Sequence, residues 1–235
     1  MTDTIDKIQA NMHAPFGPML MEFKMPQPYI DMLNTYGDKI SASDKKSKQL
    51  DWSDNLVGNV KQEHKIEPHI WQEKIGEYPS FFNWMASCLN MYMKTYMGQA
   101  IAEEIKNIKG DITGVDLHNS WIVNSIAGDF NPPHMHSGLV SAAGWTMVPE
   151  SVEKDKEKDH AGWIEWLFAD PHPLLNPKFP FKPVVGKVMF FPSWLQHQVY
   201  PLMLHLNING TMGIMVVING DNKYNTKSYC VLCRA

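Results

Sequence analysis

Arginine is nearly absent from this chain. Among 235 residues there are 21 lysines and arginines, and Arg234 is the only arginine. The guanidinium group is the usual bidentate clamp for a carboxylate, so an anion site in the body of the chain must use lysine or neutral donors. The net charge of −4 and the pI near 6.2 also lack the basic excess typical of nucleic-acid binding. Nucleic acid is therefore not an expected partner.

Cysteine and long apolar runs are also scarce. The three cysteines are a sparse set and odd in number, which argues against a disulfide framework and fits a reducing compartment. Cys230 and Cys233 form a CxxC pair, but no two further ligands lie nearby, which favours free thiols over a zinc or redox site. No apolar run reaches the ~18 residues of a membrane span, and residues 1–10 lack the order of a signal peptide. We expect a cytoplasmic protein that does not contact membranes.

Apolar residues, in contrast, make up 44% of the chain, enough for the core of one globular domain over residues 1–235. The first part, residues 1–110, reads as a strand over 15–25, a helix over 27–36 and an exposed polar loop over 41–55, to which we assign no function. A longer helix begins after Ser80, a good N-cap, and its apolar stripe predicts a helical buttress against a sheet.

The second part, residues 111–235, changes to short strands separated by turn signals. We predict strands over 115–126, 139–148, 163–168, 184–191, 196–200 and 211–218. A charged insertion over 150–160 reads as a hairpin tip, and 171–186 as a proline-punctuated loop. This pattern predicts a mostly β fold with flanking α-helices, either a sandwich or a jelly roll.

Three histidines form a candidate metal site. His134 and His136 stand two positions apart, so on a strand both rings would point to the same side. His197 follows in a separate strand, as the return strand of a jelly roll would place it. Iron oxygenases usually hold the metal with two histidines and a carboxylate. An all-imidazole face would leave the site one charge more positive and could admit zinc or nickel, and HxH pairs are as often structural as ligating.

The segments around these histidines resemble the 2-oxoglutarate/iron(II) oxygenase family common among phage-encoded proteins. The resemblance covers about residues 118–220, and its most distinctive piece is Phe-Pro-Ser-Trp-Leu-Gln-His over 191–197. It implies a double-stranded β-helix, a cupin-like jelly roll, with Fe(II) and 2-oxoglutarate as cofactors. It also implies that His134 and His197 are metal ligands and that His136 matches the second histidine of the family.

The co-substrate anchors depart from that family. Its last strand resembles Arg-x-Ser-x-x-x-Asn, and here the asparagine is Asn219 while Gly213 and Met215 stand at the arginine and serine positions. Neither residue can hold a carboxylate, and an unpaired buried carboxylate is costly. Lys187 and Thr211 are candidate substitutes for binding 2-oxoglutarate, although the alternative that Lys187 faces solvent stays open.

Two functions follow from this pattern. As an enzyme, the chain is a 2-oxoglutarate/Fe(II)-dependent dioxygenase that hydroxylates an unknown small molecule or protein substrate. As a protein that has lost this activity, it is an oxygenase-fold module of a phage virion, serving in assembly or attachment. The first reading places it in the cytoplasm, that of the host if phage-encoded, and the second in the virion. Both leave open a homo-oligomer or a phage assembly as its state.

Overall fold

The computed structural model describes residues 9–13, 17–99, 115–153, 160–170, 176–202 and 211–220. Cys230, Cys233 and Arg234 lie outside these ranges, so the predictions made for them stay predictions. The helices are α1 Gln27–Ser41, α2 Asp44–Leu50, α3 Pro68–Gln72, α4 Phe81–Gln99 and α6 Glu150–Glu153, with a 3-10 turn at Ser53–Asn55. The strands are β1 Ala10–His13, β2 Leu20–Lys24, β3 Glu63–Lys65, β4 Val115–Ser125, β5 Asn131–His134, β6 Val140–Met147, β7 Ile164–Leu167, β8 Lys178–Phe181, β9 Lys187–Pro192, β10 Gln196–Val199 and β11 Thr211–Gly220.

The strands form two facing sheets. The larger has the order β1-β2-β9-β6-β11-β4-β3 and the smaller β5-β10-β7-β8, and the strand pairs are antiparallel. In the middle of both sheets the neighbouring strands are far apart in sequence, as in β2-β9-β6-β11-β4 and β5-β10-β7, which is the topology of a jelly roll. The prediction of a mostly β double-stranded β-helix with flanking helices is therefore confirmed.

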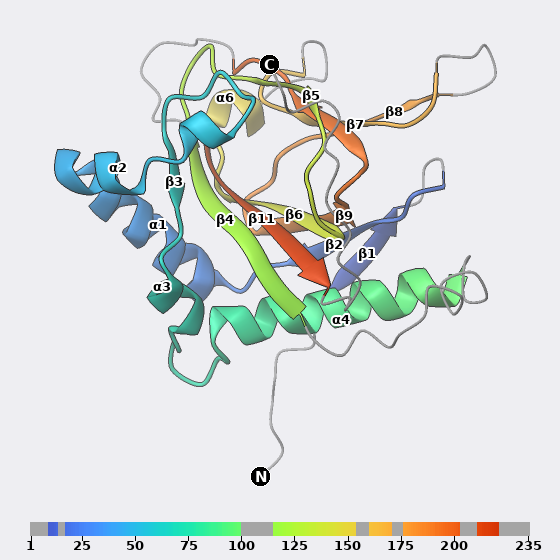
Figure 1. Cartoon of the computed structure of the whole chain (residues 1–235), viewed down its shortest axis with the longest axis horizontal. Coiled ribbons are helices and arrows are strands. Elements are labelled where there is room, and N and C mark those ends of the chain that lie inside the picture. The colour runs from blue at the N-terminus through green and yellow to red at the C-terminus, as the bar shows by residue number, and fades with distance from the viewer. Residues whose placement is uncertain are drawn as a thin grey trace.

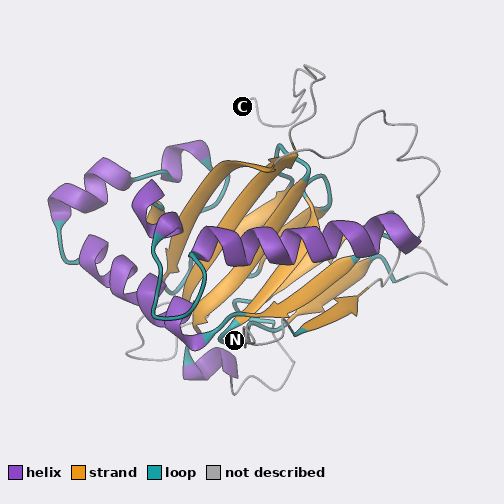
Figure 2. Ribbon diagram, turned by 90° about the horizontal axis from the view of Figure 1, so that it is seen from below, coloured by secondary structure: helices purple, strands orange, loops and turns teal. Residues whose placement is uncertain are grey.

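Helices α1, α3 and α4 pack on the outer face of the larger sheet, and α4 runs across it (Figures 1 and 2). The N-cap predicted at Ser80 is confirmed, because its hydroxyl accepts the backbone N–H of Asn83 at 3.3 Å. Tyr92, on the buried side of α4, donates its hydroxyl proton to the carbonyl of Met19 at 3.0 Å. The aromatic and methionine stripe of this helix is thus core, as the sequence indicated.

The larger sheet is buried on both faces. Along β9, Val188 and Phe190 pack under the helices, while Met189 and Phe191 pack between the two sheets. Alternate residues of a strand point to opposite sides, so a strand buried on both faces needs an uninterrupted apolar run. This explains why 188–191 shows no polar alternation, and it places every second residue of this sheet inside the jelly roll.

Some elements differ from the sequence predictions. The stretch 41–55, expected to be a loop, contains α2 and the 3-10 turn, since Ser43 caps α2 by accepting the N–H of Lys46 at 3.4 Å. The proline-rich stretch 171–186 contains β8, an edge strand that pairs only with β7, where a proline is tolerated. The boundary predicted at 110/111 stays a prediction, although β1, β2 and β3 belong to the same sheet as the later strands.

Candidate metal centre

Three histidines meet between the two sheets. His197 on β10 lies directly opposite His134 on β5 in the antiparallel pair, and their ring centroids are 4.3 Å apart. The ring of His136 lies 4.7 Å from that of His197 and 5.1 Å from that of His134. One ligand nitrogen from each ring lies within 4.8 Å of the others. The convergence predicted from the sequence is therefore present.

His136 reaches this cluster by a different route from the one predicted. Strand β5 ends at His134, so the two rings are not a simple same-face pair. Instead, the backbone N–H of His136 donates to the carbonyl of Ser193 at 2.9 Å, and the N–H of Ser193 donates to the carbonyl of Leu139 at 3.1 Å. These two bonds hold the segment after β5 against the turn that precedes β10.

Backbone carbonyls fix which nitrogen of two rings is free. The Nδ1 of His134 lies 2.8 Å from the carbonyl of Pro132, and that of His197 lies 3.0 Å from the carbonyl of Leu195. A carbonyl only accepts hydrogen bonds, so Nδ1 carries the proton and Nε2 keeps its lone pair. This is the arrangement by which proteins orient histidine ligands of metals.

Two serines complete the support of the third ring. The Nδ1 of His136 lies 2.9 Å from the hydroxyl of Ser141, which lies 2.9 Å from the hydroxyl of Ser193. When Ser141 donates to Ser193, its oxygen accepts the proton of His136 Nδ1, and His136 then has the same tautomer as the other two rings.

Burial keeps the three rings neutral. It lowers the pKa of His134, lowers that of His136 to about 3, and lowers that of His197 well below its usual value, with the neighbouring histidines adding to the last two effects. Neutral imidazole is the form that binds a metal. The Nε2 of His197 is buried and has no hydrogen-bond partner among the described residues. An Fe(II) ion would satisfy this nitrogen, and the donor set fits Fe(II) as well as zinc or nickel.

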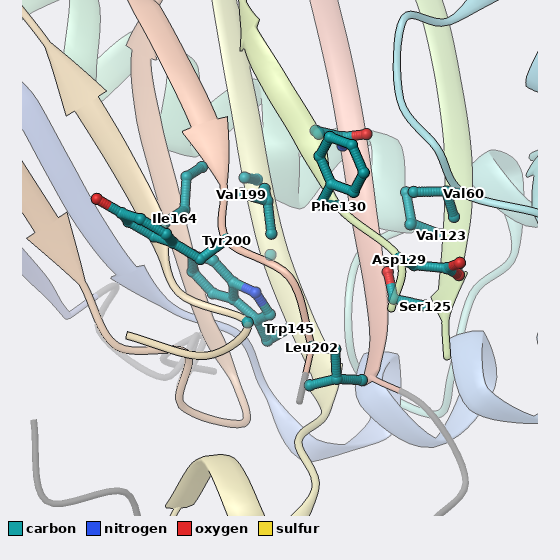
Figure 3. Close-up of a pocket in the computed structure, with 14 residues that line it drawn as sticks. Val60, Val123, Ser125, Asp129, Phe130, Trp145, Ile164, Val199, Tyr200 and Leu202 are labelled. Atoms are coloured by element: carbon teal, nitrogen blue, oxygen red, sulfur yellow. The ribbon is translucent and has the colours of Figure 1, made fainter. Parts of the chain in front are cut away.

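Two cavities lie close to one another, and one of them is lined by two of the histidines. One of about 290 Å³, here called the triad cavity, is lined by His134 and His136, by the segment 52–58 and by inward residues of β3 and β4, including Glu63 and Trp121. The other, of about 70 Å³, is lined by none of the three histidines and has Trp145 and Tyr200 on one side and Val123 and Asp129 on the other (Figure 3). Val123 and Asn131 line both.

The predicted substitute anchor Lys187 lies elsewhere. Its ammonium is 3.0 Å from the carboxylate of Glu22 and 5.2 Å from the centre of the Phe181 ring. It lines neither cavity. Phe191, whose ring is 4.9 Å from that of His197, stands four positions further along the same strand. The structure therefore does not bring Lys187 to the histidines.

The remaining predicted anchors fall on β11. Gly213 pairs with Val123 and Met215 with Trp121, so both positions are on the sheet face that looks into the jelly roll. Thr211 pairs with Ser125 and Asn219 with Asp116. The roles predicted for Thr211 and Asn219 concern side chains outside the described part of the structure, and they stay predictions.

Sequence reasoning missed several residues around the histidines. Trp52 and Glu63 lie in N-terminal segments whose local pattern is polar and irregular, so no periodic signal marks them as cavity residues. Ser193 was visible inside the distinctive segment 191–197, and only the fold shows that its carbonyl and hydroxyl support His136.

The fold and the cluster together define a class of protein, a jelly roll with three converging imidazoles that could hold a metal ion, two of which line a cavity. Residues 119–206 match the model of the family described as "Putative 2OG-Fe(II) oxygenase". The match includes all three histidines and confirms the resemblance seen in the sequence. The family description names Fe(II) and 2-oxoglutarate, the cofactors that were predicted.

One solved structure shows the same fold, and others are similar at lower scores. A prolyl-4-hydroxylase from Pseudomonas putida is 14% identical, with a TM-score of 0.50 over 94% of this chain and 97% of that one. A viral collagen prolyl hydroxylase from Paramecium Bursaria Chlorella virus-1 is 14% identical, with a TM-score of 0.45 over 92% of this chain and 98% of that one. AviO1 from Streptomyces viridochromogenes is 13% identical, with a TM-score of 0.46 over 92% of this chain and 91% of that one. No curated protein matches the chain. None of the described helices has the length and hydrophobicity of a membrane span.

Proposed function

We propose that this protein is an Fe(II)/2-oxoglutarate-dependent oxygenase that hydroxylates a molecule bound in the triad cavity. The observation that carries the proposal is the free Nε2 of His197, buried without a partner among the described residues and beside two further imidazoles. A buried nitrogen left unpaired is costly. The unpaired nitrogen of His197 and the convergence of three rings, two of them oriented by backbone carbonyls, favour metal ligands over structural side chains.

Bound Fe(II) supplies the activation of O₂ that lets 2-oxoglutarate, O₂ and a C–H bond become succinate, CO₂ and an alcohol. The chain's own part is to hold three neutral donors on one side and leave the cavity side open. Two aromatic side chains shield the donors from water. The ring centre of Phe191 lies 4.9 Å from that of His197, and the ring centre of Trp121 lies 5.9 Å from that of His136. Three neutral ligands also leave the site one charge more positive than two histidines and a carboxylate.

That additional charge matters for the co-substrate. No lysine or arginine is among the described residues that line the two cavities, and Gly213 and Met215 replace the family anchors. A hydrogen bond to a charged group contributes about 1.5–3 kcal/mol, so we expect weak binding of 2-oxoglutarate that depends mainly on the metal. Half-saturation should therefore need more 2-oxoglutarate than in relatives that keep the arginine.

The test is anaerobic reconstitution of the full chain with Fe(II), followed by O₂ and 2-oxoglutarate, with succinate and bound metal both measured. We expect one metal per chain and succinate formation that disappears in His197→Ala, while Ser87→Ala, which removes an exposed hydroxyl on α4, changes neither. Metal-free protein without turnover would refute the proposal. If that protein were also found in phage particles, the virion alternative would replace it.

A further inference from the structure

A carboxyl group lies inside the jelly roll without a cation. Glu63 on β3 pairs with Val123 of β4, so it points to the same interior face. It is 1% exposed, and it lines the triad cavity together with His134 and His136. The indole of Trp121 hydrogen-bonds to the carboxyl, but Oε2 has no partner among the described residues. A buried acceptor left in this state calls for a donor.

The surroundings of Glu63 are negative. Burial, followed by the charges of Asp129 and Asp51, raises its pKa to about 7. Asp129, 3% exposed, lines the neighbouring cavity of about 70 Å³. Glu63 is the one carboxylate among the described residues of the triad cavity, where no lysine or arginine is found. A molecule with a positive charge is therefore favoured there and an anion is disfavoured.

The cavity walls also suit an organic cation. Trp52 and Trp121 line it together with the apolar Leu56 and Val57, and aromatic faces attract ammonium and guanidinium groups. Lys65 already shows this preference, because its ammonium lies 3.8 Å from the centre of the Trp52 ring. Lys65 does not line the cavity, and none of the ion pairs of the described residues joins it to Glu63.

We propose that the triad cavity binds its substrate through a cationic nitrogen group, an ammonium or guanidinium, that pairs with the carboxylate of Glu63. A cation there would satisfy Oε2 and place the carbon chain that carries it toward His134 and His136, which line the same cavity. The proposal rests on the proposed function in one respect, that the bound cation belongs to the molecule that is hydroxylated.

The test uses the full chain loaded with Ni(II), which binds imidazoles without consuming O₂, at pH 8, where Glu63 is charged. Propylguanidinium is titrated against propylurea, a neutral molecule of nearly the same shape, with tryptophan fluorescence as the signal. A guanidinium cation does not coordinate metals, so any preference reports on the cavity. The variants are Glu63→Gln, Glu63→Asp and the matched control Glu77→Gln, which removes an exposed carboxylate.

We expect wild type and Glu77→Gln to bind the cation about tenfold or more tightly than the urea, as a charge-assisted pair predicts. Glu63→Gln should lose this preference, and Glu63→Asp should keep part of it. Equal binding of both ligands by the wild type would overturn the proposal, as would an unchanged preference in a folded Glu63→Gln variant.

Metal content and succinate are measured separately, so a chain that binds nickel and turns over without the preference refutes this inference alone. A chain that shows the preference but binds no metal refutes the proposed function alone.

Discussion

A single hydrogen bond at Nδ1 orients each histidine ring. The hydroxyl of Ser141 is 2.9 Å from His136 Nδ1 and is itself fully buried. His136 has no backbone carbonyl at its Nδ1 of the kind that fixes His134 and His197. Its orientation therefore depends on a side chain that a single substitution can remove.

We predict that Ser141→Ala lowers metal affinity by about 10–100-fold, the usual cost of losing a group that orients a metal ligand. Competition between the protein and a chelator for Co(II) measures this. Ser87→Ala, which removes an exposed hydroxyl that donates to the Asn83 carbonyl within α4, is the control and should match the wild type. Unchanged affinity in Ser141→Ala would show that packing alone orients His136.

The raised pKa of Glu63 predicts how the stability of the fold changes with pH. Its pKa is raised from 4.5 to about 7 in the folded protein, so the folded state binds more protons than the unfolded state between these values. Its contribution to stability is complete below pH 4.5 and is lost as pH rises through 7. Since a pKa shift of one unit corresponds to about 1.4 kcal/mol, the loss of stability is on the order of 3 kcal/mol.

Glu63→Gln cannot titrate and should escape that loss. The free energy of unfolding of the wild type minus that of Glu63→Gln, measured by urea denaturation from pH 4 to 8, should therefore fall as pH rises. Using the difference removes the contributions of the other carboxylates. A difference independent of pH would mean that Glu63 has an ordinary pKa.

At the scale of elements, one turn joins three parts of the larger sheet and α1. Gly186, which precedes β9, has a φ of 83°. Its N–H donates to the carbonyl of Trp145 at 2.8 Å, and its carbonyl accepts the N–H of Met25 at 2.6 Å. A Cβ here would lie 3.2 Å from Ile30 Cδ1. Both the backbone conformation and the space favour glycine.

We predict that Gly186→Ala lowers the free energy of unfolding by about 2–3 kcal/mol, since the left-handed conformation alone costs about 1–2 kcal/mol and the Ile30 contact adds to it. Gly76→Ala is the matched control, because Gly76 also has a positive φ, 57°, but a Cβ there meets nothing within 4 Å. Urea denaturation compares the two. Equal losses would show that the contact with α1 costs nothing.

At the scale of the whole molecule, the metal should connect segments that are far apart in the chain. His134 and His197 come from paired strands, and His136 from the segment held to the turn at Ser193. Free ligand at 1,000 times its dissociation constant stabilises a folded protein by about 4 kcal/mol. We therefore predict a higher melting temperature with Ni(II) than with a chelator, measured by calorimetry, and no difference in His197→Ala. A metal effect that persists in His197→Ala would place the ion at another site.

Much of this molecule could be predicted from local patterns. The apolar stripe of α4 and its cap at Ser80 predicted the helix, and the apolar run ending in Phe191 predicted β9, because both signals depend only on neighbours in sequence. β8 and α2 were missed, since an edge strand of four residues and a helix with no buried residue carry almost no periodicity.

Periodicity in the sequence predicted a mostly β fold, either a sandwich or a jelly roll. The resemblance to the oxygenase family then implied the double-stranded β-helix, the histidine ligands and the replacement of the family anchors by Gly213 and Met215. Only the tertiary structure decided that Lys187 pairs with Glu22, that Ser141 and Ser193 support His136, and that Glu63 lines the cavity beside the histidines. These contacts join segments distant in sequence, so their partners are set by the register between paired strands and by the packing of the two sheets rather than by any local preference.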